Sequence, residues 1–226
     1  MVLAIEVIEP ERHEDAEESE KVAHFYDDAE EYAELLASPE VNYGLVKPLQ
    51  ESFASHHVKG GHILDLGCGP GTVAKALPTG FSYTGIDTAR SMLVEAVLKG
   101  KYKKGYWGRI EDVIPELHQR GEQFDWGVAL SSLYYVEEPL PLIWHLAEMC
   151  KSGMVLSFDE ITQEYKVQAQ KEFGVALPLH NHSGLFDDPA NIPPGWKVSA
   201  TWHGHAWHAP RVGLSINAQV VTLVRS

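Results

Sequence analysis

The chain has few cysteines, no long hydrophobic run and no basic start. Its 226 residues include two cysteines, Cys68 and Cys150, which is too few for a disulfide framework. No apolar stretch approaches the roughly eighteen residues that a membrane-spanning helix needs. The first ten residues lack the positive charge with which a secretory signal peptide begins. These absences predict a cytoplasmic protein that does not insert into a membrane.

Positive charge is also scarce. The chain has 18 Lys and Arg against 32 Asp and Glu, which gives a formal net charge of −14. Residues 1–40 carry most of it, with fourteen acidic and two basic residues. Proteins that bind nucleic acid present a basic surface to the phosphates, so we expect no nucleic-acid partner. The one basic cluster, within residues 99–104, is expected to be a solvated turn.

Strand and helix signals alternate along most of the chain, which predicts a mostly parallel sheet with helical crossovers. Strands are expected near 62–66, 82–86, 104–107, 124–130 and 153–158, and helices near 72–77, 90–98, 112–119 and 139–149. Residues 196–205 and 214–224 are expected to form an antiparallel pair, and 176–195 a loop. We expect an acidic, mobile arm over 1–20 and a single domain over 21–226, with helices over 21–58 and a Rossmann-like core over 59–226.

The stretch 63–71 reads Ile-Leu-Asp-Leu-Gly-Cys-Gly-Pro-Gly and carries most of the functional information. A hydrophobic strand that breaks into alternating glycines before a helix is typical of a nucleotide-binding turn in a doubly wound sheet. Phe81–Asp87 is a second predicted strand that ends in an acid. In such folds this carboxylate accepts hydrogen bonds from the ribose hydroxyls of an adenosine-type cofactor. An ordinary turn at the glycines and a helix cap at Asp87 remain open as structural alternatives.

The position of Asp65 favours a particular cofactor. A carboxylate two residues before the first glycine would repel a pyrophosphate, but it suits a ligand that carries an ammonium and a sulfonium group. This points to S-adenosylmethionine. The segment Asp-Leu-Gly-Cys-Gly-Pro-Gly resembles the first motif of the class I S-adenosylmethionine-dependent methyltransferases, and the resemblance extends from about residue 22 to about residue 158. It implies a seven-stranded, Rossmann-like doubly wound sheet that is mostly parallel, with an antiparallel C-terminal pair and N-terminal helices.

The resemblance also implies which residues hold the cofactor. Asp87 would contact the ribose, Ile110 and Glu111 the adenine, and Leu130 and Ser131 the methionine and sulfonium, while Thr88 is expected among the cofactor contacts beside Asp87. Arg109 stands where many relatives have Asp, and Glu111 could instead cap a helix. Tyr26 begins the sequence Tyr-Asp-Asp-Ala-Glu-Glu-Tyr, which is similar to the Tyr-Asp-x-x-Ala-x-x-Tyr pattern of relatives but one residue shorter. In relatives this pattern lies on a helix that closes as a lid. The complete set of expected cofactor contacts is Tyr26, Asp65, Gly67, Cys68, Gly69, Asp87, Thr88, Met92, Ile110, Glu111, Leu130 and Ser131.

Methyl transfer from a sulfonium is an in-line displacement, so the enzyme must orient the acceptor and can remove its proton. Our candidates for this chemistry are His205, His182 and Tyr134, since imidazole titrates near neutral pH. His205 belongs to the sequence His203-Gly-His-Ala-Trp-His208. This cluster is open to three interpretations: a base with aromatic walls, ordinary packing, or a His-x-His-x-x-His metal site. We assign no metal.

The predicted activity is methyl transfer to an O or N atom of a small, apolar or aromatic molecule. Ser131-Ser-Leu-Tyr134 stands where relatives that act on planar amide or base nitrogens carry Asn/Asp-Pro-Pro-Tyr. Two alternatives remain: a cyclase, isomerase or decarboxylase that uses the same cofactor, and a non-catalytic binding subunit. The sequence leaves monomer and homodimer open.

Overall fold

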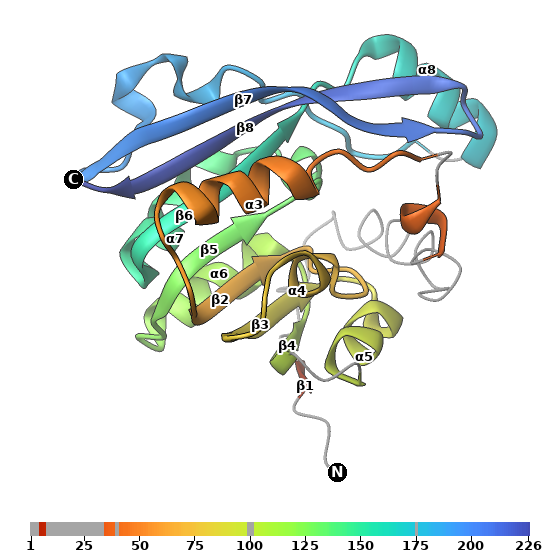
Figure 1. The fold of residues 1–226 in the computed structure, drawn as a ribbon. Helices are drawn as coiled ribbons and strands as arrows, with labels where there is room; N and C mark the ends of the chain where they lie inside the picture. The colour runs from red at the N-terminus through yellow and green to blue at the C-terminus, as the bar shows by residue number, and fades with distance from the viewer. Residues whose placement is uncertain (1–4, 8–33, 39–40, 99–101, 175) are drawn as a thin grey trace.

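An eight-stranded sheet runs through the part of the chain that the computed structural model describes, which is residues 5–7, 34–38, 41–98, 102–174 and 176–226 (Figure 1). Its strands are β1 (Ile5–Val7), β2 (Gly61–Leu66), β3 (Phe81–Asp87), β4 (Tyr102–Trp107), β5 (Phe124–Ala129), β6 (Cys150–Asp159), β7 (Trp196–Ala209) and β8 (Leu214–Arg225). Their order in the sheet is β1-β4-β3-β2-β5-β6-β8-β7. β1 to β6 pair in parallel, and β8 is antiparallel to both of its neighbours.

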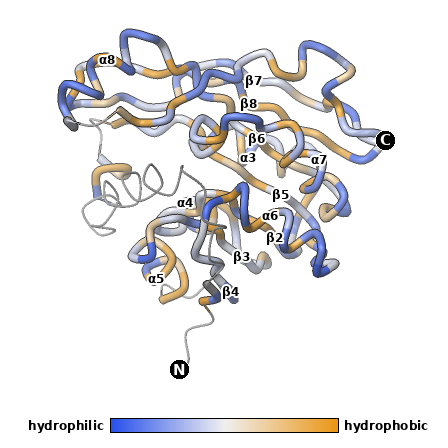
Figure 2. The backbone as a smooth tube through the Cα atoms, turned by 180° about the vertical axis from the view of Figure 1, so that it is seen from behind, coloured by the Kyte–Doolittle hydropathy of each residue, from blue (hydrophilic) through white to orange (hydrophobic). Residues whose placement is uncertain are grey.

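Helices cover both faces of this sheet. They are α3 (Val46–Ser55), α4 (Thr72–Ala76), α5 (Arg90–Leu98), α6 (Ile110–Gln119), α7 (Pro139–Met149) and α8 (Gln163–Phe173). Successive strand residues point to opposite faces, so Ile63 packs in one core with α3, α4 and α5, while Leu64 packs in the other with α6 and α7. Burial on both faces explains the nearly continuous apolar sequence of the central strands. In Figure 2 the hydrophobic stretches accordingly follow these strands.

The structure confirms the predicted fold class and corrects its strand count. The sheet is doubly wound and mostly parallel, and its C-terminal pair, β7 and β8, is antiparallel. Eight strands are present among the described residues where seven were expected, and the additional strand is β1. It pairs with the outer edge of β4, matching Ile5 with Gly105 and Glu6 with Tyr106.

β1 lies within the acidic segment that was expected to be mobile. Glu6 forms ion pairs with Lys104, at 3.0 Å, and with Arg120. Lys104 thus belongs to a strand and pairs with an acid, whereas a solvated turn was expected for its cluster. Acidity alone argued against order in this segment, but basic residues from β4 and the end of α6 compensate the charge of Glu6. Isolated exposed ion pairs contribute little, about 0–1 kcal/mol each, so strand pairing also stabilises β1.

One helix was not predicted. α8 follows β6, and its amino end is capped by the Thr162 side chain, which accepts a hydrogen bond from the Tyr165 N–H at 3.1 Å. The helix is hydrophilic over most of its surface and buries little more than Tyr165 and Ala169. A pattern with so few apolar residues gives a weak periodic signal. The stretch 176–195 is irregular as predicted, apart from two short 3-10 turns at Leu185–Asp187 and Pro189–Asn191.

The predicted lid helix falls mostly outside the described residues. Within it, residues 34–37 are helical, and α3 accounts for the second expected helix. Tyr26 lies outside the described residues, so its predicted role stays a prediction, as does the division of the chain at residue 20. Among the helices of the described segments, none has the length and apolar character needed to cross a membrane.

Candidate active site

The glycine turn joins the end of β2 to α4. Gly67 and Gly69 have φ values of +66° and +51°, in the left-handed region that side chains other than glycine rarely adopt. A Cβ on Gly67 would lie 2.4 Å from the Ser132 Cβ, so the backbone of the turn also packs tightly against the segment after β5. The glycines predicted from sequence therefore bring two strand ends close together.

Asp87 ends β3 beside this turn. Its carboxylate accepts the Gly69 N–H at 2.8 Å and the Ala89 N–H at 2.9 Å. Burial raises the pKa of Asp87 to about 6, although these backbone hydrogen bonds act in the opposite direction. Asp87 thus fixes the glycine turn and also lines the cavity beside it, where its carboxylate can accept further hydrogen bonds from a ligand.

Two cavities meet at the turn. The larger has a volume of about 780 Å3 and the smaller about 50 Å3, and Gly67, Gly69 and Ser131 line both. The predicted cofactor residues in the larger cavity are Gly67, Gly69, Asp87, Thr88, Met92, Ile110, Glu111 and Ser131. Those in the smaller cavity are Asp65, Gly67, Cys68, Gly69, Leu130 and Ser131. Every predicted cofactor residue that the structure describes therefore lines one of the two cavities.

Asp65 lines the smaller cavity and is almost fully buried, with 1% of its surface exposed. The hydroxyl of Tyr102 donates a hydrogen bond to its carboxylate. Burial raises the pKa of Asp65 to about 7; the Tyr102 hydrogen bond lowers it, and the nearby charge of Asp87 raises it further. A cationic group in this cavity would stabilise the ionised carboxylate by direct attraction.

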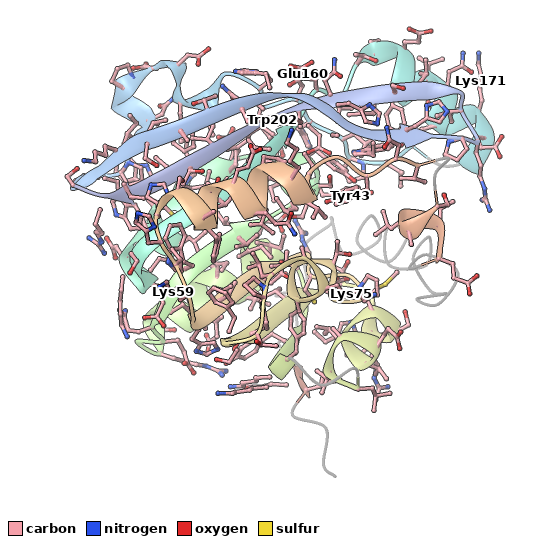
Figure 3. All side chains as sticks on the ribbon, viewed as in Figure 1. Tyr43, Lys59, Lys75, Glu160, Lys171 and Trp202 are labelled. Atoms are coloured by element: carbon pink, nitrogen blue, oxygen red, sulfur yellow. The ribbon has the colours of Figure 1, made fainter. Side chains whose placement is uncertain are left out.

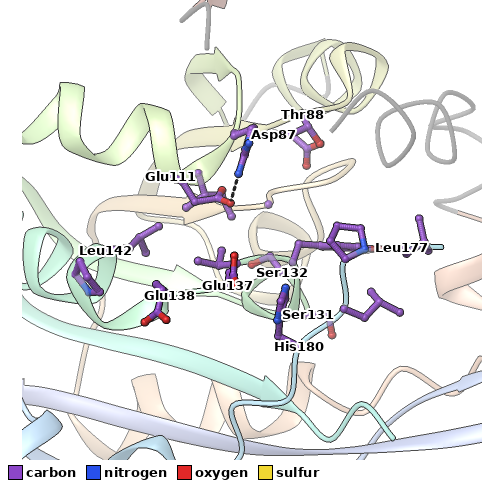
Figure 4. A pocket seen from close by; sticks show the side chains of 18 of the residues that line it. Asp87, Thr88, Glu111, Ser131, Ser132, Glu137, Glu138, Leu142, Leu177 and His180 are labelled. Atoms are coloured by element: carbon purple, nitrogen blue, oxygen red, sulfur yellow. Dashed lines mark hydrogen bonds and ion pairs between the residues drawn. The ribbon is translucent and has the colours of Figure 1, made fainter. Parts of the chain in front are cut away.

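The segment after β4 places Glu111 on the wall of the larger cavity, in the first turn of α6. Its carboxylate accepts a hydrogen bond from the Arg109 guanidinium at 2.9 Å. No side chain caps the start of this helix, so the alternative of Glu111 as a helix cap does not describe its contact. The Glu111 carboxylate can still accept a hydrogen bond from an amine of a ligand, but Arg109 already neutralises part of its charge. Figure 4 shows Glu111 across the cavity from His180.

Ser131, at the junction of the two cavities, is held by a buried carboxylate. It adopts φ +51° without being a glycine. Its N–H donates to the Ser157 Oγ at 2.7 Å, and its hydroxyl donates to the Asp159 carboxylate at 2.8 Å. Asp159 also accepts from the Ser157 hydroxyl at 3.0 Å and from the Trp207 indole N–H at 2.7 Å. Strained backbone of this kind persists where the surroundings fix it, and here Asp159 and its partners do so.

His205 does not line either cavity. It lies on β7, whose outer edge is covered by residues 41–44: Gly44 donates its N–H to the Ala206 carbonyl at 2.7 Å. The His205 Nε2 is buried and has no partner among the described residues. The strand register shifts between His205 and Trp207. Because of this irregularity, the side chain that reaches Asp159 belongs to Trp207, and the role predicted for His205 gains no support from its position.

His182 and Tyr134 lie beside the larger cavity without lining it. The His182 Nε2 hydrogen-bonds the Val136 carbonyl at 2.7 Å, which makes this nitrogen the protonated one. Burial lowers the pKa of His182, so the neutral ring is favoured. Tyr134 is 8% exposed and packs against Tyr135, with ring centroids 4.4 Å apart. Both residues support neighbours that line the cavity, Tyr135 and Val136, but neither lines it itself.

Several cavity residues were not predicted from sequence. Tyr43, which precedes α3 (Figure 3), lines the smaller cavity. Lys166, His145 and the segment 177–179 line the larger one, as does His180, which the sequence offers as a candidate base beside His182 but which was not among the three chosen residues. Two of these had a sequence signal: His180 precedes His182 by two residues, and Pro178 marks an irregular loop. Lys166 had none, because α8 itself was not predicted.

The histidines do not assemble into a metal site in the described part of the chain. No group of three or more His, Cys, Asp or Glu side chains there lies close enough to hold a metal ion. The His-x-His-x-x-His pattern on β7 is interrupted by the register shift that follows His205.

The sequence pattern of the family described as "Methyltransferase domain" matches residues 39–207, well over half of the chain. Among curated proteins, the ubiquinone biosynthesis O-methyltransferases of Coxiella burnetii strains are 27% identical over 125 residues. The match covers 54% of this chain and 53% of the relative. The chain thus spans about half the length of the curated relatives it matches.

Solved structures of methyltransferases share the fold. The magnesium protoporphyrin IX methyltransferase of Synechocystis PCC 6803 with bound S-adenosylhomocysteine is 18% identical, with a TM-score of 0.63, covering 92% of this chain and 100% of that chain. An S-adenosylmethionine-dependent methyltransferase from Mesorhizobium loti is 18% identical, with a TM-score of 0.58. The match covers 79% of this chain and 96% of that chain. Together with the match over residues 39–207, these findings confirm the resemblance seen in the glycine motif: the chain belongs to the methyltransferase domain family, as a class I S-adenosylmethionine-dependent methyltransferase.

Proposed function

We propose that the chain transfers the methyl group of S-adenosylmethionine to a hydroxyl oxygen of a small, largely apolar molecule. The observation that carries the proposal is the meeting of the two cavities at Ser131 and the glycine turn. A ligand that crosses this turn places its adenosine beside Asp87 and its amino-acid end beside Asp65. The two carboxylates suit the ribose hydroxyls and the ammonium group of S-adenosylmethionine, so the residues present fit this cofactor.

The remainder of the larger cavity is available to the acceptor. Tyr135, Leu177, Pro178 and Leu179 line it with apolar surface, as is usual for small-molecule sites. Figure 4 shows Leu177 and His180 well separated from Asp87 and Thr88. When bound, the cofactor supplies an electrophilic methyl group. The walls of the cavity orient the acceptor and exclude water, which can account for much of the rate enhancement of a displacement reaction.

Oxygen is favoured as the reacting atom because the curated relatives are named O-methyltransferases. Two histidines line the cavity, His145 on α7 and His180, and His180 stands next to the apolar segment 177–179. The backbone N–H of His180 is anchored to the Tyr134 carbonyl at 2.7 Å. Its ring stacks on His182, with centroids 5.8 Å apart. We assign to His180 the role of accepting the hydroxyl proton, in place of the three residues chosen from sequence.

The first experiment is calorimetric titration with S-adenosylmethionine and S-adenosylhomocysteine, followed by a methyl-transfer assay. The assay uses S-adenosylmethionine with a labelled methyl group and a panel of phenols, aliphatic alcohols and amines. We expect micromolar binding of both ligands and label in a hydroxyl-bearing product. Label found in amine products would move the reaction to nitrogen. A folded protein that binds neither ligand would refute the proposed function.

Replacing His180 with glutamine is expected to lower kcat on a hydroxyl acceptor by about 100-fold or more, because general-base catalysis typically contributes about 10²–10⁴-fold. The affinity for S-adenosylhomocysteine should not change, since His180 lies away from Asp87 in Figure 4. His203→Gln, an exposed histidine on β7, serves as the matched control and should retain full activity. Unchanged kcat in the His180 variant would remove this residue from the chemistry.

Cofactor affinity is expected to fall as the pH decreases through about 6. Asp87 has its pKa raised to about 6, and a protonated carboxyl cannot accept from both ribose hydroxyls. One unit below this pKa, affinity for S-adenosylhomocysteine should be roughly tenfold lower than at its plateau. Protonation of Asp65, with its pKa near 7, should begin the decline at neutral pH. Calorimetry from about pH 8 to about pH 5 measures the effect, and a flat profile would contradict it.

The same two carboxyls, of Asp65 and Asp87, should have the opposite effect on the stability of the ligand-free protein: acid should lower cofactor affinity but raise their contribution to the free energy of unfolding. Their pKa values are raised on folding, so the folded state binds more protons than the unfolded state between about pH 4 and 7. Their contribution to the free energy of unfolding therefore increases as the pH falls. The rise in Tm caused by S-adenosylhomocysteine should accordingly shrink at acidic pH. Asp87→Asn cannot titrate at this position and should show a weaker pH dependence.

A further inference from the structure

Two cationic side chains line the larger cavity, Arg109 and Lys166, and they differ in their partners. Arg109 is 2.9 Å from a carboxylate oxygen of Glu111 and 4.0 Å from one of Asp112. Its charge is therefore compensated within the protein. For Lys166, no ion pair is found among the described residues, and its side chain is half-buried. A cation among apolar walls is costly unless an anion compensates it.

α8 fixes the position of Lys166. The neighbouring Tyr165 and Ala169 are 8% and 2% exposed and pack in one cluster with Leu177, Leu179 and Tyr135. The ring of Tyr165 also meets that of Trp207 edge-on, with centroids 5.5 Å apart. The helix is thus attached to the same wall that lines the acceptor part of the cavity. Lys166 reaches the cavity from a rigid support, which is what a recognition group requires.

We propose that Lys166 binds an anionic group of the acceptor, so that the substrate is an apolar molecule with an acidic group, such as a carboxylate, in addition to its reacting hydroxyl. The inference rests on the proposed function and specifies its substrate class. The anion serves for recognition, and the hydroxyl receives the methyl group.

The carboxylates that line the cavity, Asp87, Glu111, Glu137 and Glu138, restrict where such an anion can lie. In Figure 4, Glu111 and Glu138 lie toward the end marked by Leu142 and Glu137 lies near the middle, whereas Leu177 marks the opposite end. An anionic group would be repelled by the former end and attracted by Lys166 on the α8 side. The chain as a whole carries a net charge of −14, so anions are not attracted to its surface in general. Selective binding of an apolar anion would therefore indicate a specific anion site at Lys166.

The test uses two fluorescent probes that differ in one sulfonate group: 8-anilinonaphthalene-1-sulfonate and neutral N-phenyl-1-naphthylamine. Both are titrated into the full chain, with and without saturating S-adenosylhomocysteine, which fills the cofactor part of the cavity. Lys166→Met removes the charge and keeps the length of the side chain, and Lys166→Arg restores the charge. Lys171→Met is the matched control, because Lys171 is exposed at the outer end of the same helix (Figure 3).

We expect Lys166→Met to weaken binding of the sulfonate probe roughly fivefold to tenfold, the effect of losing one partly solvated charge-assisted contact. Binding of the neutral probe should stay the same, which also shows that the cavity is intact. Lys166→Arg should retain most of the affinity, and Lys171→Met should equal the native chain. Equal losses for both probes, no loss for the sulfonate, or no binding of the sulfonate by the native chain would each overturn the proposal.

This result is separable from the proposed function. S-adenosylhomocysteine binding is read by calorimetry in the same samples and does not depend on Lys166. If that ligand binds and Lys166→Met leaves the sulfonate probe unaffected, the anion site is refuted and the methyltransferase proposal stands. If S-adenosylhomocysteine fails to bind, the proposed function fails, whatever the probes show.

Discussion

Replacing Asp87 with alanine should weaken S-adenosylhomocysteine binding by roughly 10²- to 10⁴-fold. In the proposed cofactor site the variant loses two charge-assisted hydrogen bonds to the ribose, each worth about 1.5–3 kcal/mol. It also loses the acceptor for the Gly69 N–H, at 2.8 Å, which fixes the glycine turn against β3. Both losses act on the same ligand, because Gly69 lines both cavities. Calorimetry on the purified variant measures the change.

The chain offers a close control for this variant. Asp188 accepts the Ala190 N–H at 2.9 Å, the same local contact that Asp87 makes with Ala89. Its side chain is exposed and lines neither cavity. Asp188→Ala should therefore leave cofactor affinity unchanged. Asp87→Asn keeps the size of the side chain and separates the effect of charge from that of shape. A folded Asp87→Ala protein with native affinity would refute the ribose assignment.

Replacing Asp159 with alanine should cost about 3 kcal/mol of unfolding free energy. Three groups donate to this buried carboxylate, and alanine leaves the Trp207 N–H and the hydroxyls of Ser131 and Ser157 without their acceptor. A buried donor left unsatisfied costs about 1–3 kcal/mol, partly offset because the buried charge itself is removed. Chemical denaturation of the ligand-free protein measures the loss.

Asp159→Asn should be much milder, because its amide oxygen can accept from Ser131 and Trp207 while its NH₂ group donates to the Ser157 hydroxyl. The alanine variant should also bind S-adenosylhomocysteine about tenfold less tightly, since Ser131 is no longer held at φ +51°. Methylthioadenosine, which lacks the amino-acid part of the cofactor, should bind equally to both proteins. Equal losses for the two ligands would mean that Asp159 only stabilises the fold.

The residues around the glycine turn could be located from sequence because they follow local rules. A strand, a glycine turn and a helix form one continuous motif at residues 63–76, and Asp87 ends the next strand of the same pattern. In a parallel sheet the carboxyl ends of neighbouring strands lie at one edge. Local order along the chain therefore determined which of these residues meet, and the structure places all of the described ones at the two cavities.

The contacts that support Ser131, and the wall of the larger cavity formed by α8, could not be predicted in the same way. Ser131 and Asp159 are 28 positions apart, and Trp207 is a further 48 positions away, yet they share one set of hydrogen bonds. His205 was favoured because it belongs to a histidine cluster, but the register shift on β7 brings Trp207 toward Asp159 instead. α8 carries too few apolar residues for a helical pattern to be recognised in the sequence. The helix was therefore not predicted, and neither was the position of Lys166 on it.

The sequence by itself determined the doubly wound fold, the cofactor class and the residues of the glycine turn, because strand burial and turn geometry depend on residues that are close in the chain. Only the tertiary structure decided which histidines and which lysine line the larger cavity, and which carboxylate holds Ser131. These depend on the register of β7 with β8 and on the packing of α8 against the segment 177–180. Both are set by contacts between distant segments, which residue patterns along a single sequence do not specify.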